Sequence, residues 1–227
     1  MTKIITVRMV MIDLDGTLIN TAPDLADSVN VMLERMGREP WPLDKVSGWI
    51  GNGVSRLVKR ALTDSMEGEP DSDDYEKGYA LFLEAYGENV SAKSRPYDGV
   101  VASLEKLKSA GFRLACVTNK SAVFTLPLLA DLKLDGYFEL VVSGDSLPRK
   151  KPDPLPLTHA CEHFGITPQQ GILIGDSAND VKAAIAAGMP VICVNYGYNQ
   201  GVDLTTLDTQ GVIDSLDTLD QHLELLN

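Results

Sequence analysis

Short apolar runs that end abruptly in polar residues recur along the chain, and helical patterns separate most of them. Nearly continuous, β-branched runs of this length are typical of strands that are buried on both faces of a sheet. We expect five such strands, at Val7–Leu14, Arg113–Val117, Leu140–Val142, Gly171–Gly175 and Val191–Val194.

Helical patterns occupy most of the intervals between these strands. The predicted crossover helices are Gly99–Ala110, Ala122–Leu132, Leu155–Phe164 and Ala178–Ala187. A glycine follows three of them, at Gly111, Gly165 and Gly188, and glycine commonly ends a helix. This alternation of strands and helices predicts an α/β fold with a parallel sheet.

One long segment, from about Thr21 to Arg95, breaks the alternation. It contains no convincing strand, only helical patterns at Leu25–Met36, Val54–Ala61 and Asp74–Tyr86, joined by polar loops. Arg95-Pro96-Tyr97-Asp98-Gly99 has the character of a return to the sheet. We therefore predict a discontinuous core domain of residues 1–20 and 95–227, with a helical domain of residues 21–94 inserted into it.

The composition limits the kinds of molecule that this protein is expected to bind. The 227 residues are 44% hydrophobic, which is ample for a core, and 32 acids against 20 lysines and arginines give a net charge of −12. That charge argues against a nucleic-acid or anionic-membrane partner, because either would be repelled. No stretch approaches the roughly 18 apolar residues of a membrane span, and the N-terminus has no apolar signal region. The three cysteines match no zinc spacing, so we expect buried, reduced thiols in a cytoplasmic protein.

Polar residues that could bind a ligand or take part in catalysis lie at the ends of the predicted strands. Asp13 and Asp15 end the first strand, Thr118 follows the second, and Asp176 with Asp180 follows a later one. In an open parallel sheet, ligands bind at the carboxyl ends of the strands, so these groups are expected to converge. Acids placed so close together repel each other unless a hard cation lies among them. Their oxygen-only donors suit Mg²⁺.

Lys151 supplies positive charge to this acidic protein. It lies in Lys151-Pro152-Asp153-Pro154, just before a helix whose first turn tolerates proline and whose N-terminal end is positive. Together with the hydroxyl of Thr118, its ammonium group would bind phosphate oxygens. The pattern therefore predicts a phosphate site beside a divalent cation.

Four motifs resemble those of the haloacid dehalogenase-like phosphatase superfamily. They occur in the family's order, at Val10–Leu18, Val117–Lys120, Lys150–Pro154 and Gly175–Asp180. The resemblance covers essentially the whole chain, because the helical segment after the first motif matches the family's cap. It implies a Rossmann-like parallel sheet core with an inserted α-helical cap domain.

The resemblance also implies roles for the residues in these motifs. Asp13 would be the nucleophile that forms an aspartyl-phosphate, and Asp15 would be the general acid and base. Phosphate binding is implied for Thr118, Asn119 and Lys151. Magnesium binding is implied for Asp13, the main-chain carbonyl of Asp15, Asp176 and, through water, Asp180.

Three further segments are similar to the bacterial phosphoglycolate phosphatase family, at Thr21–Leu25, Trp49–Gly53 with Leu57–Leu62, and Ser143–Pro148. This narrower resemblance implies hydrolysis of 2-phosphoglycolate. Gly51, Asn52 and Gly53 would contact the substrate, and Arg56 or Arg60 would assist Asn52 in meeting its carboxylate. Two residues depart from the family pattern: Ile12 replaces a usual phenylalanine, and Asn20 replaces a common aspartate near the hinge.

Several alternatives remain open at this point. Another small-molecule phosphatase, for a sugar phosphate, nucleotide or pyrophosphate, and a β-phosphoglucomutase-like phosphotransferase share the same motifs. Asp15 argues against a dehalogenase of this fold, which lacks the second acid. A phosphoacceptor receiver is about half this length and has no cap, and a catalytically silent binding protein is expected to have lost Asp13 or Asp15. The expected partner is a small phosphorylated metabolite, and no obligate protein partner is evident.

Overall fold

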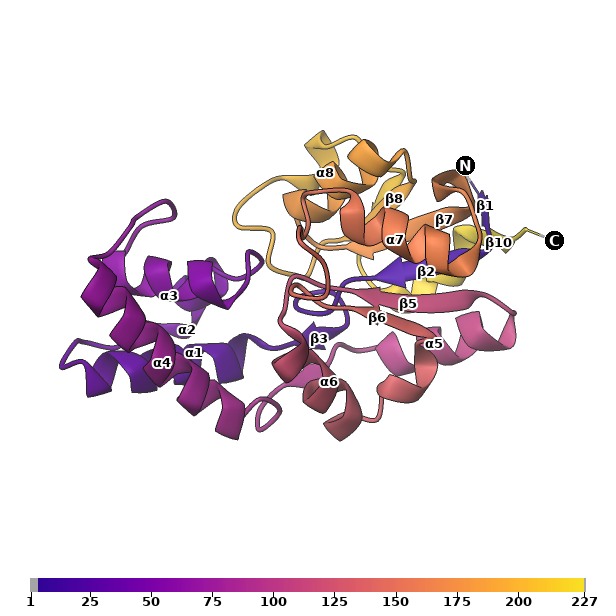
Figure 1. Ribbon diagram of the computed structural model, residues 1–227. Coiled ribbons are helices and arrows are strands. Elements are labelled where there is room, and N and C mark those ends of the chain that lie inside the picture. Colours follow the sequence, from indigo (N-terminus) through magenta and orange to yellow (C-terminus); the bar gives the residue numbers. More distant parts are fainter. Residues whose placement is uncertain (1–3, 227) are drawn as a thin grey trace.

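A six-stranded parallel sheet forms the centre of the computed structural model, which describes residues 4–226 (Figure 1). The strand order is β6-β5-β2-β7-β8-β9. The strands are β2 (Met9–Ile12), β5 (Arg113–Val117), β6 (Leu140–Val142), β7 (Gly171–Gly175), β8 (Val191–Val194) and β9 (Gly211–Ile213). The predicted α/β class is confirmed.

The central strand β2 determines where the predicted site residues meet. Met9 pairs with Arg113 of β5 on one side and with Gly171 of β7 on the other, and all three strands run in the same direction. Their carboxyl ends therefore lie side by side at one edge of the sheet. Asp13 and Thr118 follow β2 and β5 directly, so this register brings them together at that edge.

Helices cover both faces of the sheet (Figure 1). They are α5 (Val100–Ser109), α6 (Ala122–Asp131), α7 (Leu155–Phe164) and α8 (Ala178–Ala187). Met9 and Met11 of β2 pack in one apolar cluster with residues of α7 and α8, whereas Val10 and Ile12 pack in a second cluster with residues of α5 and α6. The strand side chains thus alternate between two buried layers, as the nearly continuous apolar runs predict.

Four helices lie together beside this core, between two short strands (Figure 1). They are α1 (Ala22–Arg35), α2 (Leu43–Ser47), α3 (Val54–Thr63) and α4 (Ser72–Glu88). The chain leaves the core through β3 (Ile19–Asn20) and returns through β4 (Arg95–Pro96), and these strands pair with each other antiparallel. The division into domains at residues 21 and 94 stays a proposal, which this arrangement supports. We refer to α1–α4 and their loops as the cap helices.

A buried carboxylate holds the two connections together. Asp24 in the first turn of α1 is 1% exposed and accepts hydrogen bonds from Lys93 N at 2.8 Å and Ser94 N at 2.7 Å. The Ser94 hydroxyl also donates to it, at 2.6 Å. The two connections between the core and the cap helices are therefore one connected unit and not two independent segments.

Some elements differ from the sequence prediction. The expected strand at residues 7–14 divides into β1 (Ile5–Val7), which pairs with β10 (Leu223–Leu225), and β2. The short strands β9 and β10 and the five-residue helix α2 were not predicted. Each has at most five residues, which is too few to show a helical or alternating period.

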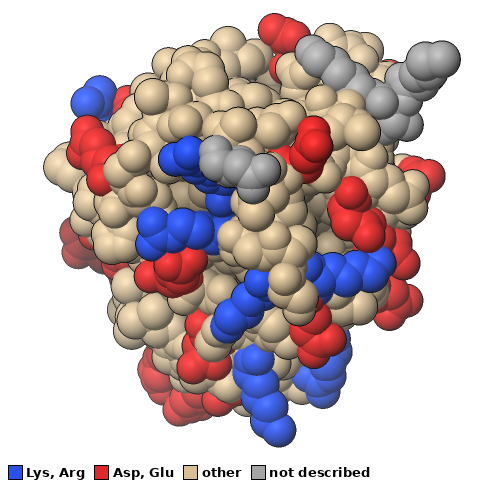
Figure 2. Space-filling view, turned by 90° about the vertical axis from the view of Figure 1, so that its right-hand side faces the viewer, with Lys and Arg blue, Asp and Glu red and all other residues tan. Residues whose placement is uncertain are grey.

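Three features bear on the expectations drawn from composition: the surface charges, the character of the helices and the burial of the cysteines. On the face of the core that is remote from the cap helices, acidic and basic side chains are interspersed (Figure 2). Within residues 4–226, none of the helices has the length and apolar character that crossing a membrane requires. Cys116, Cys161 and Cys193 are free and buried, which confirms the prediction of buried thiols.

Candidate active site

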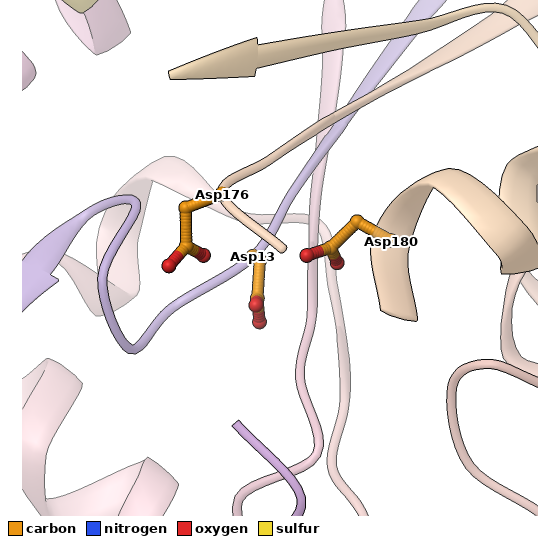
Figure 3. A group of neighbouring side chains, drawn as sticks. All are labelled: Asp13, Asp176 and Asp180. Carbon is orange, nitrogen blue, oxygen red and sulfur yellow. The ribbon is translucent and has the colours of Figure 1, made fainter. Parts of the chain in front are cut away.

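Three aspartates converge at the carboxyl ends of the central strands (Figure 3). Asp13 follows β2, Asp176 follows β7, and Asp180 lies in the first turn of α8. Each offers a carboxylate oxygen, and these oxygens lie within 4.8 Å of one another. Three hard oxygen donors at this spacing fit a small divalent cation such as Mg²⁺ and are unsuited to a soft metal.

Asp13 is held at a single oxygen. Its Oδ1 accepts a hydrogen bond from Leu14 N at 2.7 Å and an ion pair from Lys151 Nζ at 3.0 Å. Burial, reinforced by Asp180 and opposed by Lys151, raises the pKa of Asp13 to about 7. A cation at the cluster would favour the ionised form that a nucleophile requires.

Lys151 is buried beneath the cluster, with an exposure of 2%. Its ammonium group has three partners: Asp13, Asp180 Oδ1 at 2.7 Å and the carbonyl of Val117 at 2.6 Å. Burial acts to lower the pKa of Lys151, but the carboxylates of Asp13 and Asp180 outweigh burial and raise it. The lysine therefore stays charged and fixed beside Asp13.

Asp176 and Asp180 are positioned by hydrogen bonds. Asp176 accepts from the Thr17 hydroxyl at 2.9 Å and from Tyr198 N at 2.5 Å. Asp180 Oδ2 caps its own helix, accepting from Ser177 N at 3.1 Å and from the Ser177 hydroxyl at 2.6 Å. Burial, followed by the charges of Asp13 and Asp180, raises the pKa of Asp176 well above its ordinary value. Both oxygens of Asp180 and both oxygens of Asp176 thus have protein partners, whereas Asp13 Oδ2 accepts no hydrogen bond from another group among residues 4–226.

Asp15 lies at a tight turn next to the cluster and has its own lysine. Lys120 Nζ is 3.1 Å from Asp15 Oδ1 and 3.4 Å from Oδ2. Burial acts to lower the pKa of Lys120, but Asp15 and Tyr86 raise it above its usual range. The following residue, Gly16, has a φ of +87°, and a Cβ there would lie 2.3 Å from Asp176 Oδ2. Only glycine allows this close approach of the turn to the cluster.

A small cavity of about 30 Å³ lies between the core and the cap helices. Core residues Asp13, Asp15, Thr118, Asn119 and Lys120 line one side, and cap residues Leu25, Ile50, Gly51, Gly53, Val54 and Leu57 line the other. That volume accommodates about two water molecules. A phosphorylated metabolite is larger, so its entry requires the cap helices to move away from the core.

The loop at residues 50–53 closes this cavity through its backbone carbonyls. Gly51 O accepts from Asn119 Nδ2 at 3.0 Å, and Asn52 O accepts from Lys150 Nζ at 2.9 Å. Gln200 Nε2 donates to Ile50 O at 2.6 Å. Three separate loops of the core thus hold one loop of the cap. We call these contacts the loop clasp.

The predicted phosphate- and substrate-binding residues have different environments. Thr118 and Asn119 line the cavity, but the Asn119 amide group is already engaged, donating to Gly51 O and to Lys151 O, while its Oδ1 has no hydrogen-bond partner among the described residues. Gly51 and Gly53 also line the cavity, and Asn52 is held by the clasp.

Neither candidate arginine reaches the cavity. Arg56 pairs with Glu67 and with Glu69 at the surface, the latter at 2.7 Å. Arg60 is buried and donates to the carbonyl of Trp49 at 2.6 Å. Both guanidinium groups stabilise the cap helices, so neither is placed to meet a substrate carboxylate in this conformation.

Three residues near the site were not predicted as functional. Lys120 is part of the second motif, but a charged residue after a strand resembles an ordinary loop lysine. Thr17 and Tyr198 support Asp176, and Tyr198 is 22 residues from it in the sequence. Proximity to a strand end could have indicated Lys120, but no local signal marks Tyr198.

Comparison with known proteins assigns a family. The haloacid dehalogenase-like hydrolase family matches residues 10–194. A phosphoglycolate phosphatase of Thiobacillus denitrificans is 54% identical over 92% of both chains, and one of Nitrosococcus oceani is 52% identical over 92% of this chain and 93% of the relative. The crystal structure of a predicted phosphoglycolate phosphatase from Haemophilus somnus superposes with a TM-score of 0.89 at 36% identity, covering 95% of this chain and 97% of that one.

Proposed function

This chain belongs to the haloacid dehalogenase-like hydrolase family, as its four motifs predict, and from that premise we propose that it is a magnesium-dependent phosphatase of 2-phosphoglycolate. The observation that carries the proposal is that Asp13 and Asp15 line one cavity and that Lys151 Nζ lies 3.0 Å from Asp13 Oδ1. The substrate is inferred from the relatives, which are phosphoglycolate phosphatases with 54% and 52% identity.

Asp13 acts as the nucleophile in this proposal. Its Oδ1 is held by Leu14 N and Lys151, which leaves Oδ2 to attack phosphorus. A bond forms between Oδ2 and phosphorus, the ester bond breaks, and its electron pair goes to the glycolate oxygen, which takes a proton from Asp15. Lys151 faces the phosphoryl oxygens and stabilises their charge.

The second half of the reaction restores the enzyme. Asp15 now removes a proton from a water molecule, the water oxygen attacks phosphorus, and the bond between phosphorus and Asp13 breaks. Inorganic phosphate leaves, and Asp15 is again protonated for the next substrate. Thr118 and Asn119 are proposed to hold the phosphoryl group through both steps.

Magnesium fits the donor set of the three aspartates. Asp13, Asp176 and the main-chain carbonyl of Asp15 would hold it, with Asp180 contributing through water because its Oδ1 is already paired with the Lys151 ammonium group at 2.7 Å. When bound, the ion would neutralise negative charge on the phosphoryl group. Asp176 is held for this purpose by Thr17 and Tyr198.

The cap loop contributes size selection. Gly51 and Gly53 bring the main chain next to the cavity, and Asn52 is fixed by the clasp, so the closed conformation fits only a small leaving group. The protein would act alone, in the cytoplasm, on a small phosphorylated metabolite.

The decisive experiment combines Asp13→Asn with a substrate panel. Asp13→Asn and removal of Mg²⁺ by a chelator are each expected to abolish turnover, whereas Asp73→Asn at an exposed position of α4 is expected to leave it unchanged. The panel compares 2-phosphoglycolate with sugar phosphates, nucleotides and pyrophosphate. Full activity of Asp13→Asn contradicts the mechanism, and a clear preference for another panel member contradicts the substrate.

A further inference from the structure

Lys120 is a buried cation to which the proposed mechanism assigns no role. It is 3% exposed, although it lines the cavity. Its Nζ lies 3.1 Å from Asp15 Oδ1, and no other side chain among residues 4–226 donates to that carboxylate. Burying an ammonium group is costly unless it is paired and hydrogen-bonded, and the carboxylate that pairs with this one belongs to the proposed acid-base residue.

The backbone of Lys120 is fixed as firmly as its side chain. Lys120 N donates to the Thr118 hydroxyl at 3.2 Å, and Lys120 O accepts from Gly144 N at 2.8 Å and from the Thr125 hydroxyl at 3.2 Å. The backbone that carries the ammonium group is therefore held rigidly. A rigid charge defines where the Asp15 carboxyl lies, because that carboxyl otherwise follows a flexible side-chain torsion.

Tyr86 links this lysine to the cap helices. It lies in the last turn of α4, is fully buried, and packs against Phe124 of α6 at a ring distance of 4.8 Å. Its hydroxyl is 2.5 Å from Lys120 Nζ. The end of α4 thus reaches the core beside α6 (Figure 1). The chain of contacts runs from α4 through Tyr86 and Lys120 to Asp15.

We propose that Lys120 is a positioning residue that orients the Asp15 carboxyl toward the leaving-group oxygen, and that Tyr86 fixes Lys120 when α4 is seated on the core. The inference rests on the proposed function, in which Asp15 protonates the leaving group. A misplacement of about 1 Å at a reacting group can cost about 10²-fold in rate. Asp15 would accordingly be aligned only while the cap helices and the core are in contact.

Two substrates of similar size distinguish a loss of Asp15 positioning from a general disturbance of the active-site structure. The leaving group of 2-phosphoglycolate is an alkoxide, which needs a proton. That of acetyl phosphate is a carboxylate, whose conjugate acid has a pKa of about 4, so it departs without one. The value of kcat/KM reports the steps up to departure of the leaving group, and therefore the acid role of Asp15 alone.

The test measures kcat/KM of Lys120→Met and Tyr86→Phe with both substrates. For Lys120→Met we expect a loss of about 10²-fold or more with 2-phosphoglycolate, the typical worth of a general acid, and less than about 5-fold with acetyl phosphate. Tyr86→Phe removes one hydroxyl and keeps the ring, so its loss with 2-phosphoglycolate is expected at about 2- to 10-fold. Lys77→Met and Tyr79→Phe on α4 are the matched controls and should behave as the wild type.

Each outcome decides the question. Equal losses with the two substrates, in variants that melt as the wild type does, would make Lys120 a structural residue and overturn the proposal. Should Lys120→Met fail to fold, Tyr86→Phe carries the test by the same criterion. If the wild type does not cleave acetyl phosphate, carbamoyl phosphate of the same size replaces it, because its carbamate also leaves without a proton. Turnover by Asp13→Asn would instead refute the proposed function, independently of Lys120.

Discussion

Gly16→Ala tests whether the position of Asp176 controls activity. Gly16 has a φ of +87°, and an added Cβ would lie 2.3 Å from Asp176 Oδ2 and 2.8 Å from Tyr198 Cδ2. The backbone strain of a non-glycine residue in this region costs about 1–2 kcal/mol. In addition, the Asp176 carboxylate must retreat by about 1 Å to relieve the contact, a displacement that can reduce a rate about 10²-fold.

The two effects separate in two assays. The strain predicts a melting temperature about 2–8 °C lower, since about 1 kcal/mol corresponds to about 2–4 °C in a chain of this size. The displacement predicts a fall in kcat of about 10²-fold and a higher Mg²⁺ requirement. Gly37→Ala is the matched control, because Gly37 has a φ of +71° but no atom within 4 Å of an added Cβ. It should lose similar stability and retain full kcat.

The result that refutes this reasoning is specific. A folded Gly16→Ala protein with kcat within about 3-fold of the wild type would show that Asp176 tolerates the shift, and the metal-binding role proposed for it would lose its support. A large loss of kcat in Gly37→Ala would show that strain alone, and not the contact with Asp176, affects catalysis.

Three other predictions concern the clasp, the hinge and the thiols. Gln200→Ala removes neutral hydrogen bonds to the loop at residues 50–53 and should lower kcat/KM for 2-phosphoglycolate about 2- to 10-fold, whereas Gln169→Ala on the far edge should not. Asp24→Ala leaves buried donors unpaired and should reduce the free energy of unfolding by about 3 kcal/mol in urea titration, against less than about 1 kcal/mol for the exposed Asp27→Ala. Burial raises the pKa values of all three cysteine thiols, so a disulfide reagent should label none in the native protein and three in urea; native labelling would contradict their placement.

The sheet and the aspartate cluster were predictable because both follow from short-range pattern. Each central strand is a continuous apolar run, and the first polar residues after Ile12 and Val117 must lie at the same edge once the strands are parallel. The partners of these residues were not predictable in the same way. Lys120 meets Asp15 across 105 positions and Tyr86 across 34, distances at which local sequence contains no information on contact.

The arginines of the cap show a second reason why some contacts of the site could not be predicted from the sequence. Arg56 and Arg60 were candidates for the substrate carboxylate because a cation at a small-molecule site is chemically reasonable. A helical pattern does not show which way a long side chain turns, and the acidic loop that follows α3 offers Arg56 two carboxylates at close range. Short-range ion pairs of this kind compete with a distant substrate, and here the structure favours the ion pairs.

The charges at the site explain how a protein of net charge −12 can bind a phosphate ester. The ionisable groups of the site are four aspartates and two lysines (Asp13, Asp15, Asp176, Asp180, Lys120 and Lys151). The proposed first step requires a protonated Asp15, so with the other five groups ionised the site carries one excess negative charge, which one divalent cation would more than offset. Exposed acids elsewhere are screened beyond about 8 Å at physiological ionic strength, so they contribute little to this balance. The proposed Mg²⁺ would thus give the site a net positive charge toward a phosphate dianion, whereas without the ion the dianion would enter a site that already carries excess negative charge.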